Sequence, residues 1–345
     1  MSDQPVTRAS RRPIDLLRNA GGMMEVGTVE DGPIAAMLST KDKLYFIKTR
    51  AIYSVQLADQ IDPNRQNPDI PNTQRRELSF GSEHFAVARI LLTAEVLFKK
   101  TALGQSFDVK QAIELTIDLL KDIAAVIDMR ERLEVSQQEA ATAIATESPV
   151  HRMLRLPSVD NLEARCDAFA QKAAHVVNGL ERLAKIFYPT ELPSKWIDGL
   201  IRTLKQREGD GSVFAAYMTE IRPFLMFVLD MRNMIEHPKP NESVKVDDFR
   251  LLPSGELAPP SVEIVRLDEP VERTELKVMM ETVTQNLVNV CEALLVYLCD
   301  SNINVCGAFA SLRVIQLPPA QRQNAHIRFS YGYYNGQTMI PISVG

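Results

Sequence analysis

The spacing of apolar residues is that of α-helices over most of the chain. Between residues 81 and 304, apolar side chains recur every three or four positions, which places them on one face of a helix. Segments with this spacing cover residues 82–100, 108–145, 158–188, 193–206, 214–236 and 274–300. The pattern therefore predicts a mainly α fold in which long helices form a bundle.

The N-terminal region carries weaker signals. Residues 1–25 are polar and contain several glycines and arginines, so we expect a loose arm there. Residues 34–62 have apolar residues at helical spacing, which predicts a helical extension. Residues 62–76 hold three prolines and must form a loop, because each proline removes a backbone donor. Residues 1–80 are thus interpreted as an arm followed by a helical extension.

Two segments have the features of β-structure. Residues 244–266 resemble a short hairpin that turns at Ser254–Gly255. The C-terminal tail alternates between apolar and polar residues and contains Asn335–Gly336, a strong hairpin signal. We therefore expect a helical bundle over residues 81–304 with a small inserted β-hairpin, and a C-terminal β element over residues 305–345.

Several residues mark where the helices begin and end. Asp108 is a candidate N-cap with Gln111 three residues later, and Ser158 is a candidate cap of the next helix. Tyr188–Pro189 predicts the end of that helix. Pro223 lies within the segment 214–236, but the apolar pattern resumes in phase, so we expect a kink and not a break.

Composition and missing motifs exclude several classes of function. The net charge is −5, so a global basic field for nucleic acid is excluded and an anionic partner would need a local patch. We expect no signal peptide, no membrane span and a cytoplasmic protein whose scattered cysteines stay reduced. The chain has no phosphate-binding glycine loop, nucleophile elbow or metal-ligand spacing. We therefore expect no cofactor, and any chemistry would be metal-free or would use a metal brought by the substrate.

One short stretch, "DMRNMIEHPKP", departs from its surroundings. The apolar stripe of its helix, continued by one step, reaches Arg232, and five residues later comes His237, followed by Pro238. The proline disfavours helical backbone at His237, so the imidazole can turn back toward the arginine. An arginine that grips phosphate beside a histidine that exchanges protons is a minimal set of groups for cleaving RNA. The alternative is a surface ion pair between Arg232 and Glu236, with His237 as an ordinary cap.

The stretch "MRNMIEHP" resembles the signature of the HEPN (higher eukaryotes and prokaryotes nucleotide-binding) domain family. That signature is an arginine, a polar residue, a short spacer and a histidine near the end of a bundle helix. The long helices before it and the last helix after it also fit, so the resemblance covers about residues 81–304. It implies a HEPN-like bundle and a metal-independent endoribonuclease that acts as a homodimer.

The resemblance also implies roles for three residues. Arg232 would hold the scissile phosphate, His237 would act as general acid–base or position the 2′-hydroxyl, and Asn233 would orient the pair. Members of the family serve as toxins, antiphage effectors or RNA-processing factors, so a neutralising protein partner is also implied. One branch has a modified tyrosine in a His-x-Tyr motif, but this chain has Lys239 there. Many members are non-catalytic, so a module that binds RNA, nucleotide or protein remains the alternative.

The C-terminal tail combines basic and aromatic side chains. Residues of these two kinds include Arg322, Arg328, Tyr331, Tyr333 and Tyr334. Such a mixture can stack and neutralise single-stranded RNA. The alternative is that the aromatic residues cap the bundle or pair strands across a dimer.

Overall fold

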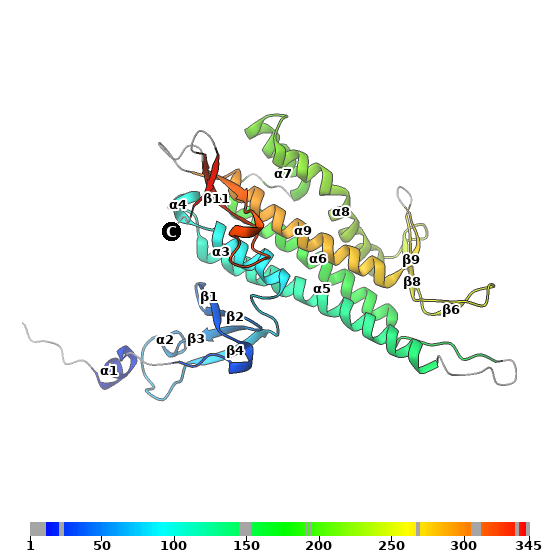
Figure 1. Cartoon of the computed structure of the whole chain (residues 1–345), viewed down its shortest axis with the longest axis horizontal. Helices are drawn as coiled ribbons and strands as arrows, with labels where there is room; N and C mark the ends of the chain where they lie inside the picture. The colour runs from blue at the N-terminus through cyan, green and yellow to red at the C-terminus, as the bar shows by residue number, and fades with distance from the viewer. Residues whose placement is uncertain are drawn as a thin grey trace, which may run out of the picture. The chain divides into compact units, whose positions relative to one another are not determined.

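The structure is a computed structural model that describes residues 12–20, 24–144, 153–190, 192, 195–266, 270–304, 312–334 and 338–342. The chain forms two compact units, Met1–Val87 and Ala88–Gly345. It is a mixed α/β protein that is 52% helical, with several long helices (Figure 1). The expected mainly α class is therefore too simple, because the N-terminal unit is built around a sheet.

The N-terminal unit contains a four-stranded antiparallel sheet with the strand order β1-β2-β3-β4. Its strands are β1 (Ile34–Ser39), β2 (Leu44–Lys48), β3 (Ile52–Gln56) and β4 (Thr73–Leu78). Three short helical segments accompany them: α1 (Pro13–Asn19), η1 (Val29–Asp31) and α2 (Ala58–Ile61). The core of the unit is formed by Val26, Phe46, Ala51, Tyr53 and Val55.

The helical extension predicted over residues 34–62 is therefore wrong. Tight turns at residues 40–43 and 48–51 reverse the chain, as shown by the bonds from Thr40 N to Lys43 O and from Lys48 N to Ala51 O. Strands β2 and β3, on either side of the second turn, are rich in β-branched and aromatic residues, which pack well on a pleated surface. Strand pairing thus outweighs an apolar spacing that fits a helix only by coincidence.

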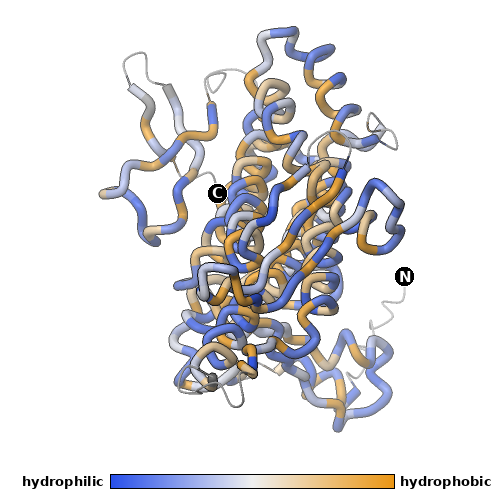
Figure 2. Tube along the Cα trace, turned by 90° about the vertical axis from the view of Figure 1, so that its right-hand side faces the viewer, coloured by the Kyte–Doolittle hydropathy of each residue, from blue (hydrophilic) through white to orange (hydrophobic). Residues whose placement is uncertain are grey.

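The larger unit is a bundle of long helices. Its helical segments are η2 (Val87–Leu92), α3 (Thr93–Leu97), α4 (Lys100–Leu103), α5 (Val109–Ile144), α6 (Leu162–Phe187), α7 (Trp196–Glu208), α8 (Val213–Glu236) and α9 (Leu276–Asp300). Helices α5, α6 and α9 lie side by side, and α8 packs on α6 and α7 (Figure 1). Apolar and polar residues alternate along the long helices (Figure 2), as the spacing predicts.

Most predicted helix ends are confirmed. The Asp108 carboxylate accepts a hydrogen bond from Gln111 N at 3.0 Å, as an N-cap does. Helix α6 ends at Tyr188, and α8 continues through Pro223. The cap at Ser158 is wrong, because α6 begins at Leu162 after Asn161 in a left-handed conformation (φ 55°). The Ser158 hydroxyl instead donates to Asp248 at 2.7 Å.

Small sheets lie between α8 and α9. A three-stranded antiparallel sheet has the order β5 (Ser243–Asp247), β8 (Ser261–Val265), β9 (Val271–Glu275). Between β5 and β8, the strands β6 (Arg250–Leu251) and β7 (Leu257–Ala258) form the predicted hairpin. It turns at Ser254–Gly255, where Gly255 has a φ of +87° that favours glycine. The inserted element is therefore larger than one hairpin.

The C-terminal sheet has the order β10 (Leu312–Gln316), β11 (Phe329–Tyr334), β12 (Met339–Pro341). Strands β11 and β12 pair antiparallel, but the predicted turn at Asn335–Gly336 lies outside the described residues. The Tyr331 side chain is buried, and its hydroxyl donates to Leu97 O at 2.7 Å. The Arg328 guanidinium binds Glu292 on α9, which also accepts from Arg89. These contacts favour a bundle-capping role for Tyr331.

Helix α9 is long and apolar enough to cross a membrane by length and composition alone. Its apolar side chains include Leu287, Leu294 and Leu298, each fully buried against the rest of the bundle. Contacts with α3, α5, α6 and α8 surround it. This is the environment of the core helix of a bundle, which passes the same test of length and composition.

Candidate functional site

The candidate site lies at the C-terminal end of α8. The buried face of α8 continues from Val228 through Met231 and Met234, each spaced three residues from the last. The apolar stripe therefore does not reach Arg232, whose side chain is 40% exposed. Arg232 sits beside the buried face and not on it, because Met231 occupies the position that points into the core.

Arg232 is held by two neighbours on its own helix. One guanidinium nitrogen lies 2.6 Å from the Glu236 carboxylate, and another donates to Asn233 Oδ1 at 3.1 Å. The alternative interpretation of the sequence, a surface ion pair at positions i and i+4, is thus present. Pairs of this kind stabilise a helix by about 0.3–0.5 kcal/mol, so the pair can exchange for a stronger anion at little cost.

His237 ends the helix. Its φ and ψ angles of −135° and 65° are not helical, as expected for a residue before proline. Its backbone N–H donates to Asn233 O at 2.8 Å, which is the last helical hydrogen bond. The imidazole is exposed to solvent. The helix thus ends with a histidine side chain that can meet a ligand.

Asn233 and His237 line one groove with a volume of about 660 Å³. Its other lining residues come from α8, the loop after α8, and the end of β8: Arg222, Pro223, Met226, Asp230, Met234, Lys239, Glu242 and Arg266. Arg232 is not among them. The structure therefore brings Asn233 and His237 to one groove, while Arg232 lies next to it and is linked to it through the Asn233 amide.

Five charged residues of this groove were not predicted from the sequence: Arg222, Asp230, Lys239, Glu242 and Arg266. A signal for two of them was present. Positions 222, 226, 230, 233 and 237 are spaced by four, four, three and four residues, which is one face of a helix. Arg266 could not be found this way, because β-strand pairing brings it to α8 from a distant part of the chain.

The cations of the groove are paired with carboxylates. Arg222 lies 2.6 Å from Asp198, Lys239 lies 2.6 Å from Glu242, and Arg266 lies 3.8 Å from Asp230. Partial burial raises the pKa of Asp230, and the charge of Arg266 opposes this shift. The side chain therefore holds its proton to a higher pH than an ordinary aspartate. A phosphate entering the groove would have to displace these carboxylates from their cations.

The residues that the structure describes give no sign of a metal centre. Within them, no three His, Cys, Asp or Glu side chains gather closely enough to hold a metal ion. The thiols of Cys166, Cys291 and Cys299 are free and buried. Burial raises the pKa of Cys166 to about 12, so this thiol is unsuited to nucleophilic or metal-binding chemistry near neutral pH.

Comparison with known proteins adds no assignment. No family model matches the chain, and searches of curated proteins and of solved structures find no match.

Proposed function

We propose that this protein is a metal-independent endoribonuclease of the HEPN type, acting at the end of α8. The observation that carries the proposal is the groove in which Asn233 and the exposed His237 meet, with Arg232 hydrogen-bonded to Asn233. The HEPN-like bundle over residues 81–304 belongs to this proposal. So do its cytoplasmic setting and its use as a toxin, antiphage or stress effector with a neutralising partner.

The proposed reaction uses the substrate's own nucleophile. The 2′-hydroxyl attacks the adjacent phosphorus, His237 accepts its proton, and a bond forms between O2′ and phosphorus. The bond from phosphorus to O5′ breaks, and the leaving oxygen takes a proton from an imidazolium or from water. Arg232 exchanges Glu236 for the phosphate and stabilises the charge that develops on it. The products carry a 2′,3′-cyclic phosphate and a 5′-hydroxyl.

A homodimer would complete this site. The Arg232 side chain lies beside the groove that contains the histidine of the same chain. A second copy docked on the α8 ends would place its own arginine and histidine at the same phosphate. In a two-fold dimer the same patch faces itself, so both pairs would line a single cleft.

The test is cleavage of end-labelled RNA by the purified full-length chain in excess EDTA. Cleavage that leaves 2′,3′-cyclic phosphate ends is expected. Arg232→Ala and His237→Ala should each lower the rate by roughly 10²–10⁴-fold, as the loss of a phosphate grip or a general acid–base does. Arg132→Ala is the matched control, because Arg132 also pairs with a carboxylate four residues away on an exposed helix face. Unchanged cleavage in His237→Ala would contradict the proposal.

A second candidate is a non-catalytic module that binds RNA, nucleotide or a protein partner. The place of Arg232 outside the groove that Asn233 and His237 line favours it, because a phosphate held by Arg232 need not lie within reach of the imidazole. In this case the wild-type chain would bind RNA without cleaving it. Binding that is weakened by Arg232→Ala, with no cleavage by any variant, would distinguish this function from the first.

A further inference from the structure

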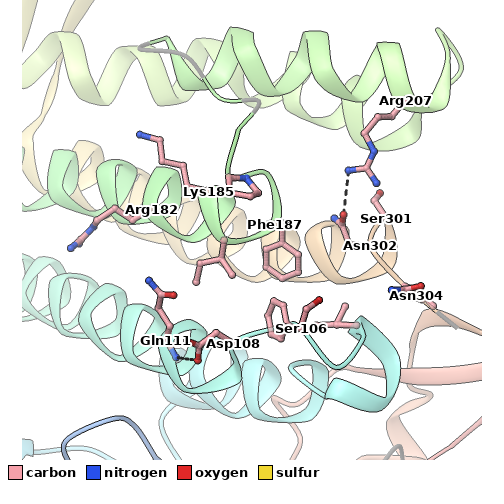
Figure 3. Close-up of a pocket in the computed structure, with 15 residues that line it drawn as sticks. Ser106, Asp108, Gln111, Arg182, Lys185, Phe187, Arg207, Ser301, Asn302 and Asn304 are labelled. Atoms are coloured by element: carbon pink, nitrogen blue, oxygen red, sulfur yellow. Dashed lines mark hydrogen bonds between the residues drawn. The ribbon is translucent and has the colours of Figure 1, made fainter.

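A second pocket lies at the opposite end of the bundle from the α8 groove. It has a volume of about 830 Å³ and is lined by the loop before α5, the ends of α6 and α7, and the segment after α9 (Figure 3). Helix α9 packs against β8 and β9 near its start and reaches this pocket at its end. Its 25 residues span roughly 37 Å, so the two sites are separate.

The floor of the pocket is aromatic. Phe107 and Phe187 line it, with ring centroids 5.1 Å apart and planes inclined by 44°. Both rings contact Phe98, which is buried, at 5.6 and 6.1 Å. The rings are thus fixed by the core and still line the pocket, as Figure 3 shows for Phe187. Such a floor suits a flat, apolar part of a ligand.

Cations lie at both ends of this floor. Arg182 and Lys185 project from α6, and Arg207 comes from α7 and points toward Asn302 (Figure 3). Lys185 pairs with Glu181 at 2.6 Å. Among the described residues, no carboxylate forms an ion pair with Arg182 or Arg207. This differs from the α8 groove, where each arginine has an acidic partner.

The Arg207 end is held by contacts within the protein. The guanidinium donates to Asn302 Oδ1 at 3.3 Å and lies 5.0 Å from the Tyr188 ring. The Asn302 amide in turn donates to the Tyr188 hydroxyl at 3.0 Å and to Leu298 O at 2.9 Å. The lining carboxylate, Asp108, accepts from Gln111 N as the cap of α5. A preorganised guanidinium beside amide and hydroxyl groups fits a phosphate.

We propose that this pocket binds a small aromatic phosphate ester, with its ring on Phe107 and Phe187 and its phosphate at Arg207. The 830 Å³ volume is large enough for a ligand of this class. A nucleotide and a vitamin-derived pyridine phosphate share this chemistry. The proposal is independent of RNA cleavage, because it concerns the other end of the bundle.

The test is titration of the full-length chain with phenyl phosphate, followed by ligand-observed NMR. Phenyl phosphate should bind more tightly than phenol or inorganic phosphate, because only the ester can contact the aromatic rings and the Arg207 guanidinium at the same time. Arg207→Gln should weaken binding about tenfold, the usual effect of losing a hydrogen bond to a charged group. Lys205→Gln is the matched control, since Lys205 lies in the last turn of the same helix but does not line the pocket.

Two further ligands show whether the natural ligand is a nucleotide or a pyridine phosphate. AMP or pyridoxine 5′-phosphate should bind at least as tightly as phenyl phosphate, and the tighter of the two identifies the class. The proposal is overturned if neither binds, or if inorganic phosphate binds as well as phenyl phosphate. It is also overturned if Lys205→Gln weakens binding as much as Arg207→Gln, because the effect would then be general attraction.

Discussion

At the scale of single residues, the geometry of the candidate site at the end of α8 depends on which neighbours its polar side chains contact. The sequence predicted correctly that Pro238 would end the helix at His237, because proline restricts the residue before it. It placed Arg232 on the buried stripe, which was wrong by one position. An apolar alternative, Met231, was available one residue earlier and buries more readily than a guanidinium. The helix face that lines the groove could have been predicted from the spacing of residues between Arg222 and His237.

Glu236 controls how free Arg232 is to meet an anion. Because Glu236→Gln removes the partner charge at 2.6 Å, we predict that RNA affinity rises roughly twofold, equivalent to an exposed helix ion pair. The salt dependence of binding should also steepen, as one more cation becomes available to phosphate. A filter-binding titration at several salt concentrations measures both quantities.

The control for this prediction is Asp128→Asn, which frees Arg132 from a similar ion pair at 2.9 Å on α5. It removes the same amount of negative charge from an exposed helix. An equal gain in RNA affinity in both variants would mean that net charge alone decides binding, and that Arg232 has no special place in it.

At the scale of elements, long amphipathic helices were predictable and short strands were not. Helices α5, α6, α8 and α9 each repeat their apolar spacing over many turns, so chance matches average out. The strands β2 and β3 are five residues each, which is too short for the alternation of a strand to be distinguished from the spacing of a helix. The contact of Arg89 and Arg328 with the buried Glu292 was also invisible, because these residues are far apart in the sequence.

The N-terminal sheet is stabilised by the nearly buried carboxylate of Asp31. It accepts hydrogen bonds from Thr28 N at 2.9 Å and from the Tyr53 hydroxyl at 2.9 Å, and lies 3.2 Å from Arg76. The backbone hydrogen bond from Thr28 is the largest cause that lowers the pKa of Asp31, and Tyr53 and Arg76 add to it. One carboxylate thus joins η1, β3 and β4.

This lowered pKa predicts how the stability of the unit depends on pH. The contribution of Asp31 is complete above about pH 4, the ordinary value of an aspartate, and is lost as pH falls through the lowered pKa. Hydrogen-exchange protection of β2 and β3 should therefore decrease below pH 4 in the wild type. Asp31→Asn should show lower protection at pH 7 and a flatter pH profile.

The control is Asp69→Asn, an exposed aspartate in the loop before β4. It should keep both the protection at pH 7 and the decrease at acid pH. A wild-type profile that stays flat down to pH 2, or an Asp31→Asn variant as protected as the wild type, would contradict the role of Asp31.

At the scale of the whole molecule, the proposed nuclease needs more than one chain. The HEPN resemblance implied a composite site, and we propose that a second chain completes the groove of His237, because Arg232 of the same chain lies beside this groove and not in it. The aromatic pocket at the far end of α9 was not foreseen at all. Four separate segments of the chain form it, and only folding brings them together.

The most direct test of the composite site mixes active and inactive chains. Wild type is co-refolded with a roughly ninefold excess of the Arg232→Ala/His237→Ala double variant, and RNA cleavage is measured per wild-type chain. If two chains share each site, random pairing leaves about a tenth of wild-type chains in active dimers, and activity falls in proportion. Activity per wild-type chain that stays constant would show that one chain suffices, and would contradict the account.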